Sequence, residues 1–229
     1  MREETPEALI RNNTLLSSPP LLPELRLYLA TEVTPLWRVT ESWLSQKGIE
    51  PPFWAFAWAG GQAITRFLLD RPEIVRGKTV LDIASGSGLC GLGASRAGAK
   101  RVICVDRDPL AKVAAEMNAA ENGLLLSAFS EDILADLVLP AWALGASVIL
   151  AGDVCYDAAM TRLFWPWLLQ RAREGALVLL GDPGRAYLPK EQLLEVARYR
   201  VPTLDDVEAA GEKWGVVYQV VLGQEALVV

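Results

Sequence analysis

The fold of this chain is decided by the stretch Leu81-Asp82-Ile83-Ala84-Ser85-Gly86-Ser87-Gly88-Leu89-Cys90-Gly91. An apolar, β-rich segment runs into a glycine-rich turn with G-x-G-x-x-G spacing, and a helical pattern follows the turn. Glycines let the backbone approach a ligand closely, and the start of the helix offers unpaired N–H groups. The motif predicts a cofactor-binding loop; taken alone, it also fits a tight strand–helix turn that binds nothing.

Strands and helices alternate around this loop. Strands are expected at Thr79–Ala84, Arg101–Val105, Leu124–Phe129, Ser147–Ala151 and Ala176–Leu180. Helices are expected at Gln62–Leu69, Leu89–Ala97, Pro109–Asn122 and Ala158–Arg171, the last one kinked or restarted at Pro166. This alternation predicts an α/β fold with a Rossmann-like, mostly parallel sheet and helices on both faces. Tyr199–Leu204 and Val216–Leu222 leave no room for a crossover helix, which predicts a C-terminal antiparallel hairpin.

The first 50 residues differ from the rest. Prolines interrupt short helical patterns over Pro23–Ala30 and Leu36–Leu44. We expect residues 1–50 to form an irregular helical extension that covers one side of the main domain, residues 51–229. A chain of 229 residues is long enough for one domain with a sizeable core.

Composition excludes several kinds of chemistry. The chain has no histidine, which rules out Ser-His-Asp or Cys-His catalysis and His-ligated metals, and we expect no metal site. The net charge of −6 argues against a nucleic-acid partner. We expect neither a signal peptide nor a membrane span, because residues 1–4 are charged and the longest uncharged stretch, Leu137–Gly152, is too short. Cys90, Cys104 and Cys155 form no C-x-x-C pair, which favours reduced thiols in the cytoplasm.

Two acidic residues narrow the choice of cofactor. Asp106 ends the strand after the glycine loop, where a carboxylate can accept hydrogen bonds from both hydroxyls of an adenosine ribose. Nicotinamide dinucleotides and S-adenosylmethionine share this geometry. Asp82 precedes the first loop glycine and would repel a pyrophosphate, but it attracts the amino group and the sulfonium of S-adenosylmethionine. This cofactor is therefore the prediction, and a nicotinamide-dependent reductase is the alternative from another enzyme class.

With these residues the chain resembles the class I, seven-stranded S-adenosylmethionine-dependent methyltransferases. Asp82–Gly88 resembles their first motif, Asp106 their second-strand acid and Asp132 the acid that reads the adenine. The resemblance implies a seven-stranded sheet and a cofactor site that includes Asp82, Ser85, Gly86, Ser87, Gly88, Asp106, Arg107 and Asp132. Ala84 departs from the family, which usually has glycine there, and narrows the loop slightly.

The segment after the fourth predicted strand indicates the methyl acceptor. It reads Asp153-Val154-Cys155-Tyr156, and this Asp-x-x-Tyr pattern resembles the motif of the seven-stranded protein-lysine methyltransferases. Trp58-Ala59-Gly60-Gly61 is similar to their tryptophan-glycine segment, which adds Trp58, Gly60 and Asp153 to the implied cofactor site. Thr31–Trp37 and Pro52–Trp58 resemble the electron transfer flavoprotein beta subunit lysine methyltransferases. That family implies the electron transfer flavoprotein beta subunit as protein substrate, and the ribosomal protein L11 methyltransferases are its broader relatives.

Lysine methylation agrees with the residues at this strand end. A lysine amine has a pKa of about 10.4 and must lose its proton before it attacks a methyl group. We expect Asp153 to orient the amine and Tyr156 to form one wall or accept a hydrogen bond, as the two catalytic residues. Asp153 is too weak a base to take the proton itself. In the alternative interpretation, Asp153 only caps the helix over Ala158–Arg171 and Tyr156 packs under it.

Other residues near the site leave the interpretation open. Trp37 and Trp54 are expected in the core, whereas Trp58 fits the core and the site equally well. Arg185 and Tyr187 lie on a loop that borders the substrate cleft or is simply solvated. We expect a monomer that binds neither nucleic acid nor membrane. The alternatives are an L11-type or small-molecule methyltransferase and a non-catalytic adaptor that retains the cofactor fold.

Overall fold

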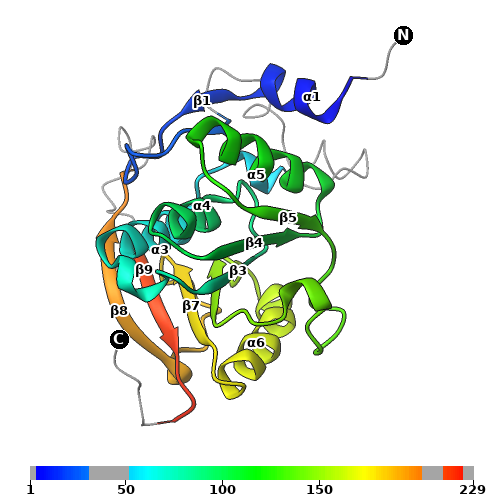
Figure 1. Ribbon diagram of the computed structural model, residues 1–229. Coiled ribbons are helices and arrows are strands. Elements are labelled where there is room, and N and C mark those ends of the chain that lie inside the picture. Colours follow the sequence, from blue (N-terminus) through cyan, green and yellow to red (C-terminus); the bar gives the residue numbers. More distant parts are fainter. Residues whose placement is uncertain (1–3, 31–51, 203–213, 224–229) are drawn as a thin grey trace.

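The structure is a computed structural model that describes residues 4–30, 52–202 and 214–223. At its centre lies a seven-stranded sheet with the order β5-β4-β3-β6-β7-β9-β8 (Figure 1). Its strands are β3 (Thr79–Ile83), β4 (Arg101–Asp106), β5 (Ser127–Ser130), β6 (Val148–Gly152), β7 (Leu177–Asp182), β8 (Leu193–Arg200) and β9 (Trp214–Val220). The strands from β5 to β7 pair in parallel, and β9 is antiparallel to both β7 and β8. The mostly parallel sheet and the antiparallel C-terminal strands predicted from the sequence are confirmed.

Helices cover both faces of this sheet. The longer ones are α3 (Ala59–Asp70), α4 (Leu89–Arg96), α5 (Pro109–Asn122) and α6 (Ala158–Arg173), and the short 3-10 helices are η2 (Phe53–Ala55), η3 (Pro72–Ile74), η4 (Ala141–Ala143) and η5 (Lys190–Gln192). On one face α3 and α4 bury side chains such as Ile64 and Ala94 against the central strands. On the other face α6 buries Phe164, Trp167 and Leu168. The central strands are apolar on both faces, as expected for a covered parallel sheet.

Helix boundaries follow the local signals of the sequence in most places. Asp108 caps α5 by accepting a hydrogen bond from the N–H of Leu110 (2.8 Å), and Gly123 ends the helix with a left-handed φ of 61°. Pro166, in contrast, does not restart α6, which runs unbroken from residue 158 to residue 173. Pro166 is exposed, so water can reach the carbonyl that loses its helical partner.

The N-terminal part is only partly the helical extension that was predicted. α1 (Pro6–Asn13) is a helix, but β1 (Leu15–Ser17) and β2 (Leu27–Leu29) form a small antiparallel sheet. A helix over Pro23–Ala30 is therefore wrong. Leu25, Leu27 and Leu29 are buried against the start of α4, and this tertiary contact outweighs a weak helical pattern. The pattern over Leu36–Leu44 lies outside the described residues.

Side chains of α5 hold this N-terminal part to the main domain. The N–H of Tyr28 donates to Oδ1 of Asn118 (2.8 Å), and the N–H of Arg26 donates to Oδ1 of Asn122 (2.9 Å). Asn118 is fully buried, and its Nδ2 donates to the carbonyl of Ser87 (2.9 Å). One side chain thus joins β2 to the glycine loop, so the N-terminal part supports the loop from behind.

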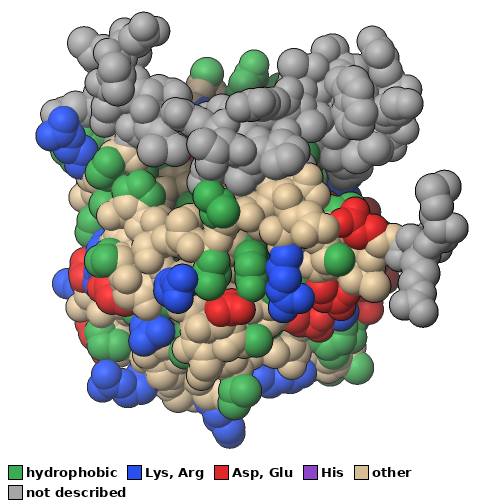
Figure 2. Space-filling model, turned by 90° about the horizontal axis from the view of Figure 1, so that it is seen from above, with side chains coloured by type: hydrophobic (Ala, Val, Ile, Leu, Met, Phe, Trp, Pro, Cys, Tyr) green, Lys and Arg blue, Asp and Glu red, His purple; other side chains and the backbone are tan. Residues whose placement is uncertain are grey.

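The surface carries a mixture of side chains. Figure 2 shows acidic, basic and hydrophobic groups interspersed on the described part of the face seen from above.

Within the described ranges, no helix is both long and apolar enough to cross a membrane. The three cysteines are buried and free.

Candidate functional site

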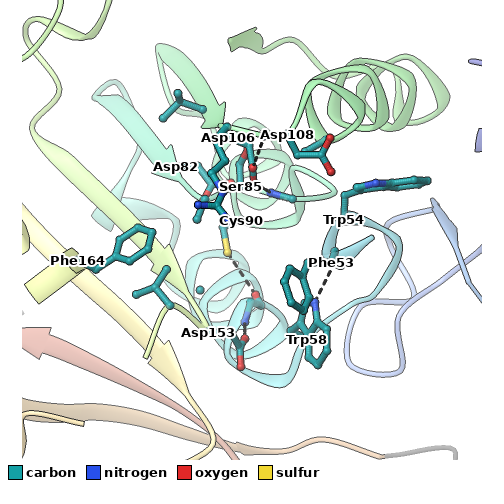
Figure 3. A pocket seen from close by; sticks show the side chains of 18 of the residues that line it. Phe53, Trp54, Trp58, Asp82, Ser85, Cys90, Asp106, Asp108, Asp153 and Phe164 are labelled. Carbon is teal, nitrogen blue, oxygen red and sulfur yellow. Dashed lines mark hydrogen bonds between the residues drawn. The ribbon is translucent and has the colours of Figure 1, made fainter. Parts of the chain in front are cut away.

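A pocket of about 390 Å³ opens at the carboxyl ends of β3, β4 and β6. Between β3 and β6 the order of the strands reverses direction along the sheet, and ligands of open α/β sheets bind at such a point. Figure 3 shows Asp82, Ser85 and Asp106 on one side of this pocket and Trp58 and Asp153 on the other. We call the first side the cofactor end. We call the second side the transfer end.

The glycine loop is built for close approach. Gly86 and Gly88 have left-handed φ angles of 50° and 76°, which favour glycine. A Cβ on Gly88 would lie 2.8 Å from Cβ of Ala115, and a Cβ on Gly91 would lie 2.4 Å from Sγ of Cys104. Gly86 shapes the loop over the pocket. Gly88 lets α5 approach the loop, and Gly91 lets α4 pack on β4.

The two acids at the cofactor end are held by backbone groups. Oδ2 of Asp82 accepts a hydrogen bond from the N–H of Gly91 (2.8 Å), within the first turn of α4. The oxygens of Asp106 accept from the N–H groups of Gly86 (2.9 Å) and Asp108 (3.0 Å). Within the described residues, neither acid forms an ion pair with a lysine or arginine. The cofactor end therefore holds two carboxylates that no described cation neutralises at contact distance.

Burial changes the acidity of both groups. It raises the pKa of Asp82, which is 1% exposed, to about 8. It also raises the pKa of Asp106 above its ordinary value, while the two backbone N–H donors act in the opposite direction. A cationic ligand would reverse this effect, because an opposite charge favours the ionised carboxylate. The cofactor end thus fits a ligand that carries positive charge and an adenosine ribose.

The transfer end is organised around Asp153. This residue follows β6 with a left-handed φ of 58°, which aspartate tolerates better than most side chains. Its Oδ2 accepts from the N–H of Gly61 at the start of α3 (2.9 Å), and its Oδ1 accepts from Nη1 of Arg185 (2.8 Å). Burial raises the pKa of Asp153, and the Arg185 guanidinium opposes that rise. Both oxygens are thus fixed in direction, and each keeps a second lone pair.

Aromatic rings form the wall beside Asp153. The ring centroid of Phe53 lies 6.0 Å from that of Trp58 and 5.7 Å from that of Tyr156. The ring centroids of Phe56 and Trp58 are 5.6 Å apart. Nε1 of Trp58 donates to the carbonyl of Phe53 (2.9 Å), which fixes the indole. Trp58 and Tyr156 are 41% and 39% exposed, so these rings meet both pocket and solvent. The wall is apolar and open at its outer edge.

Most residues predicted for the site line this single pocket. They are Trp58, Asp82, Ser85, Gly86, Ser87, Asp106, Arg107, Asp132, Asp153 and Tyr156. Gly60 and Gly88 lie behind the lining. A Cβ on Gly60 would lie 2.3 Å from the carbonyl oxygen of Gly181, so Gly60 serves the packing of α3 on β7. The roles of the lining residues toward a cofactor remain predictions.

The structure decides several choices that the sequence left open. Oδ1 of Asp157 accepts from the N–H of Met160 (2.7 Å) and caps α6, so the interpretation that Asp153 only caps this helix is wrong. Trp54 is buried as expected, Trp58 belongs to the site, and Arg185 lines the pocket. Trp37 lies outside the described residues.

Some lining residues were missed. Phe53 and Phe56 belong to the aromatic segment before the glycine pair, and that clustering was a signal for them. Met160, Leu163 and Phe164 come from α6. They look like ordinary helical apolar residues, and only the packing of α6 beside the strand ends places them at the pocket.

This combination of fold and pocket defines a class. A Rossmann-like sheet with this strand order carries the glycine loop at its carboxyl edge. The pocket holds Asp82 and Asp106 at one end, where they fit a cationic ligand with an adenosine ribose. At the other end Asp153 lies beside the aromatic wall. These features are those of an S-adenosylmethionine-dependent methyltransferase.

Comparison with known proteins narrows the class. The family model of ribosomal protein L11 methyltransferase (PrmA) matches residues 64–152. The electron transfer flavoprotein beta subunit lysine methyltransferase of Xenopus laevis is 39% identical over 191 residues, which cover 82% of this chain and 74% of that protein. The corresponding protein of Rattus norvegicus is 36% identical over 197 residues, covering 83% and 74%. The chain belongs to the family of electron transfer flavoprotein beta subunit lysine methyltransferases.

A solved structure supports the fold. The branched-chain polyamine synthase from Thermus thermophilus, in complex with N4-aminopropylspermidine and 5'-methylthioadenosine, has a TM-score of 0.51 and 19% identity. The match covers 71% of this chain and 56% of that chain. At this identity the match shows the Rossmann-like fold alone.

Proposed function

We propose that this protein transfers methyl groups from S-adenosylmethionine to lysine side chains of the electron transfer flavoprotein beta subunit. The observation that carries the proposal is the arrangement of Asp153 and Tyr156 beside an open aromatic wall, in the same pocket as Asp82 and Asp106. The family to which the chain belongs supports the choice of substrate.

The cofactor end supplies binding and orientation in this proposal. Asp106 would accept the ribose hydroxyls, Asp82 would face the positively charged methionine part, and Asp132 would accept from the adenine amino group. Bound S-adenosylmethionine supplies an electrophilic methyl group, and this chemistry needs neither histidine nor metal. The protein therefore contributes mainly alignment, which accounts for several kcal/mol of barrier lowering in well-oriented reactions.

The transfer end prepares the acceptor. The second lone pair of an Asp153 oxygen can accept a hydrogen bond from the incoming amine and direct the nitrogen lone pair toward the methyl group. The rings of Phe53, Trp58 and Tyr156 remove water from the amine, which favours its neutral, nucleophilic form. The proton is lost to solvent through the open edge of the wall before transfer.

The test is methylation of purified electron transfer flavoprotein beta subunit with labelled S-adenosylmethionine, read by mass spectrometry of its lysine peptides. We expect lysine methylation by the wild type, with strong loss in Asp153→Asn. Ribosomal protein L11 serves as the second substrate, because the PrmA family model matches residues 64–152. Methylation of L11 alone would replace the proposed substrate, and methylation of neither protein would overturn the proposal.

We further propose that the protein acts in the cytoplasm as a monomer, without nucleic acid or membrane. Three free, buried cysteines support a reducing compartment. Size-exclusion chromatography with light scattering would test the monomer, localisation of a tagged protein would test the compartment, and binding assays with nucleic acid and with liposomes would test the other two points.

A further inference from the structure

Arg185, Asp153 and Asp182 form an ion cluster at the ends of β6 and β7. Nη1 of Arg185 lies 2.8 Å from Oδ1 of Asp153 and 2.9 Å from Oδ2 of Asp182. The side chain of Asp182 is fully buried, that of Asp153 is 8% exposed and that of Arg185 is 25% exposed. A single guanidinium nitrogen therefore bridges two buried carboxylates at the wall of the pocket.

The loop after β7 is shaped to make this bridge. Oδ1 of Asp182 accepts hydrogen bonds from the N–H groups of Gly184 and Arg185, both at 2.7 Å. Gly184 has a left-handed φ of 94°, which lets the chain turn back over the strand ends. The turn brings Arg185 to Asp153, although the two residues are 32 positions apart in the chain.

Each element packed around Asp153 presents a defined group to it. Asp182 comes from β7, Cys90 from α4, Cys155 from the turn after β6, and the N–H of Gly61 from the start of α3. Arg185 is the only cation among these groups in the described part of the chain. Without it, burial and the charge of Asp182 would both favour protonation of Asp153.

We propose that Arg185 is a positioning residue for methyl transfer, which bridges Asp182 and Asp153, stabilises the carboxylate form of Asp153 and directs it at the acceptor amine. A protonated Asp153 would have lost one acceptor site and its fixed orientation. The inference rests on the proposed lysine methylation.

The test is a double-mutant cycle of Arg185→Gln and Asp153→Asn, with kcat and KM measured across pH on the electron transfer flavoprotein beta subunit. We expect Arg185→Gln to lower kcat about tenfold at neutral pH, with KM changed less than about threefold. The acid limb of its kcat–pH profile, where kcat falls as the pH is lowered, should move up by about one pH unit. In the Asp153→Asn background the same change should have little further effect, because it acts through Asp153. Arg185→Lys should restore part of kcat and return the acid limb toward the wild-type position.

Arg198→Gln is the matched control. Arg198 also pairs with a carboxylate, Glu195 (2.7 Å), but it lies exposed on β8, outside the pocket lining. We expect wild-type kcat and an unchanged pH profile. Additive losses in the cycle, or a loss in Arg185→Gln with an unmoved acid limb, would show that Arg185 acts otherwise and would overturn the inference. If Arg185→Gln does not fold, Arg185→Met, which also removes the charge, replaces it in the cycle and is judged by the same two criteria.

A second readout separates this inference from the choice of substrate. If the wild type methylates no lysine, the proposed function fails, and the pKa of the Asp153 carboxyl group is then measured by NMR titration in the wild type and in Arg185→Gln. We expect this pKa to be higher in Arg185→Gln, because the guanidinium no longer stabilises the carboxylate. An unchanged pKa would overturn the role of Arg185.

Discussion

At the cofactor end of the pocket, Asp82 and Asp106 accept hydrogen bonds from backbone N–H groups, whereas at the transfer end Asp153 and Asp182 share the guanidinium of Arg185. The first arrangement leaves negative charge to be met by a ligand. The second compensates one of its two negative charges within the protein. The difference matches the two ligands: a cationic cofactor is bound for its charge, but an acceptor lysine must arrive without its proton.

The largest expected effect separates the two ends directly. Asp153→Asn keeps the shape and tolerates the left-handed backbone, but it removes the carboxylate that orients the amine. We expect kcat on the protein substrate to fall about 100-fold while the Kd for S-adenosylmethionine changes less than about threefold. Asp106→Asn should do the reverse, raising that Kd about tenfold or more through weaker ribose hydrogen bonds. Calorimetry and steady-state kinetics check both, and equal effects on Kd and kcat would erase the distinction between the ends.

A substitution behind the pocket tests whether packing maintains the transfer end. In Gly60→Ala the new Cβ would lie 2.3 Å from the Gly181 carbonyl oxygen and 2.6 Å from Oδ2 of Asp153. We expect a loss of about 1–3 kcal/mol in unfolding free energy and a large loss of activity. Gly61→Ala is the control, because its Cβ would meet Leu89 Cδ2 at an ordinary 3.7 Å. Thermal and denaturant unfolding should give a clearly lower unfolding free energy for Gly60→Ala than for Gly61→Ala. Equal unfolding free energies would contradict the close contact of Gly60 with β7.

The pH dependence of cofactor binding probes the charge at the cofactor end. The pKa of Asp82 is raised to about 8, so below that pH the protein holds a proton that a cationic ligand must displace. The affinity for S-adenosylmethionine should therefore increase from about pH 6 to about pH 8, by up to about fiftyfold, with release of a proton. Asp82→Asn should flatten this slope. Calorimetry in buffers of different ionisation enthalpy measures the proton, and uptake instead of release would contradict the assignment.

The smallest expected effect concerns Ala84, where the family usually has glycine. Its φ of 47° lies in the left-handed region, which costs an L-residue about 1–2 kcal/mol. Glycine removes this strain but gains freedom in the unfolded chain, so Ala84→Gly should stabilise the protein by no more than about 1 kcal/mol. Gly77→Ala is the reciprocal control, with a φ of 73° and open space around its Cβ, and it should destabilise by a similar amount. A destabilised Ala84→Gly would show that the strain is relieved elsewhere.

The sequence by itself determined the features that depend on neighbouring residues. Alternating apolar strands and helices, the cap at Asp108 and the glycine loop are local, and they predicted the sheet, the helix start and the cofactor end. The acids Asp82, Asp106 and Asp153 could be predicted as site residues because each lies at or next to the carboxyl end of a buried strand. Parallel strands then bring these ends to one edge of the sheet, as the pocket shows.

Only the tertiary structure decided what depends on residues far apart in the chain. In the small sheet of β1 and β2, burial of Leu27 and Leu29 against α4 and the hydrogen bond from the N–H of Tyr28 to Asn118 outweigh a local helical pattern. The close packing of Gly60 on β7 depends on Gly181, a residue far along the chain. The bridge from Arg185 to Asp153 depends on how a turn after β7 folds back over β6. A local pattern carries no information about such contacts, because their energy arises only once the sheet has brought the segments together.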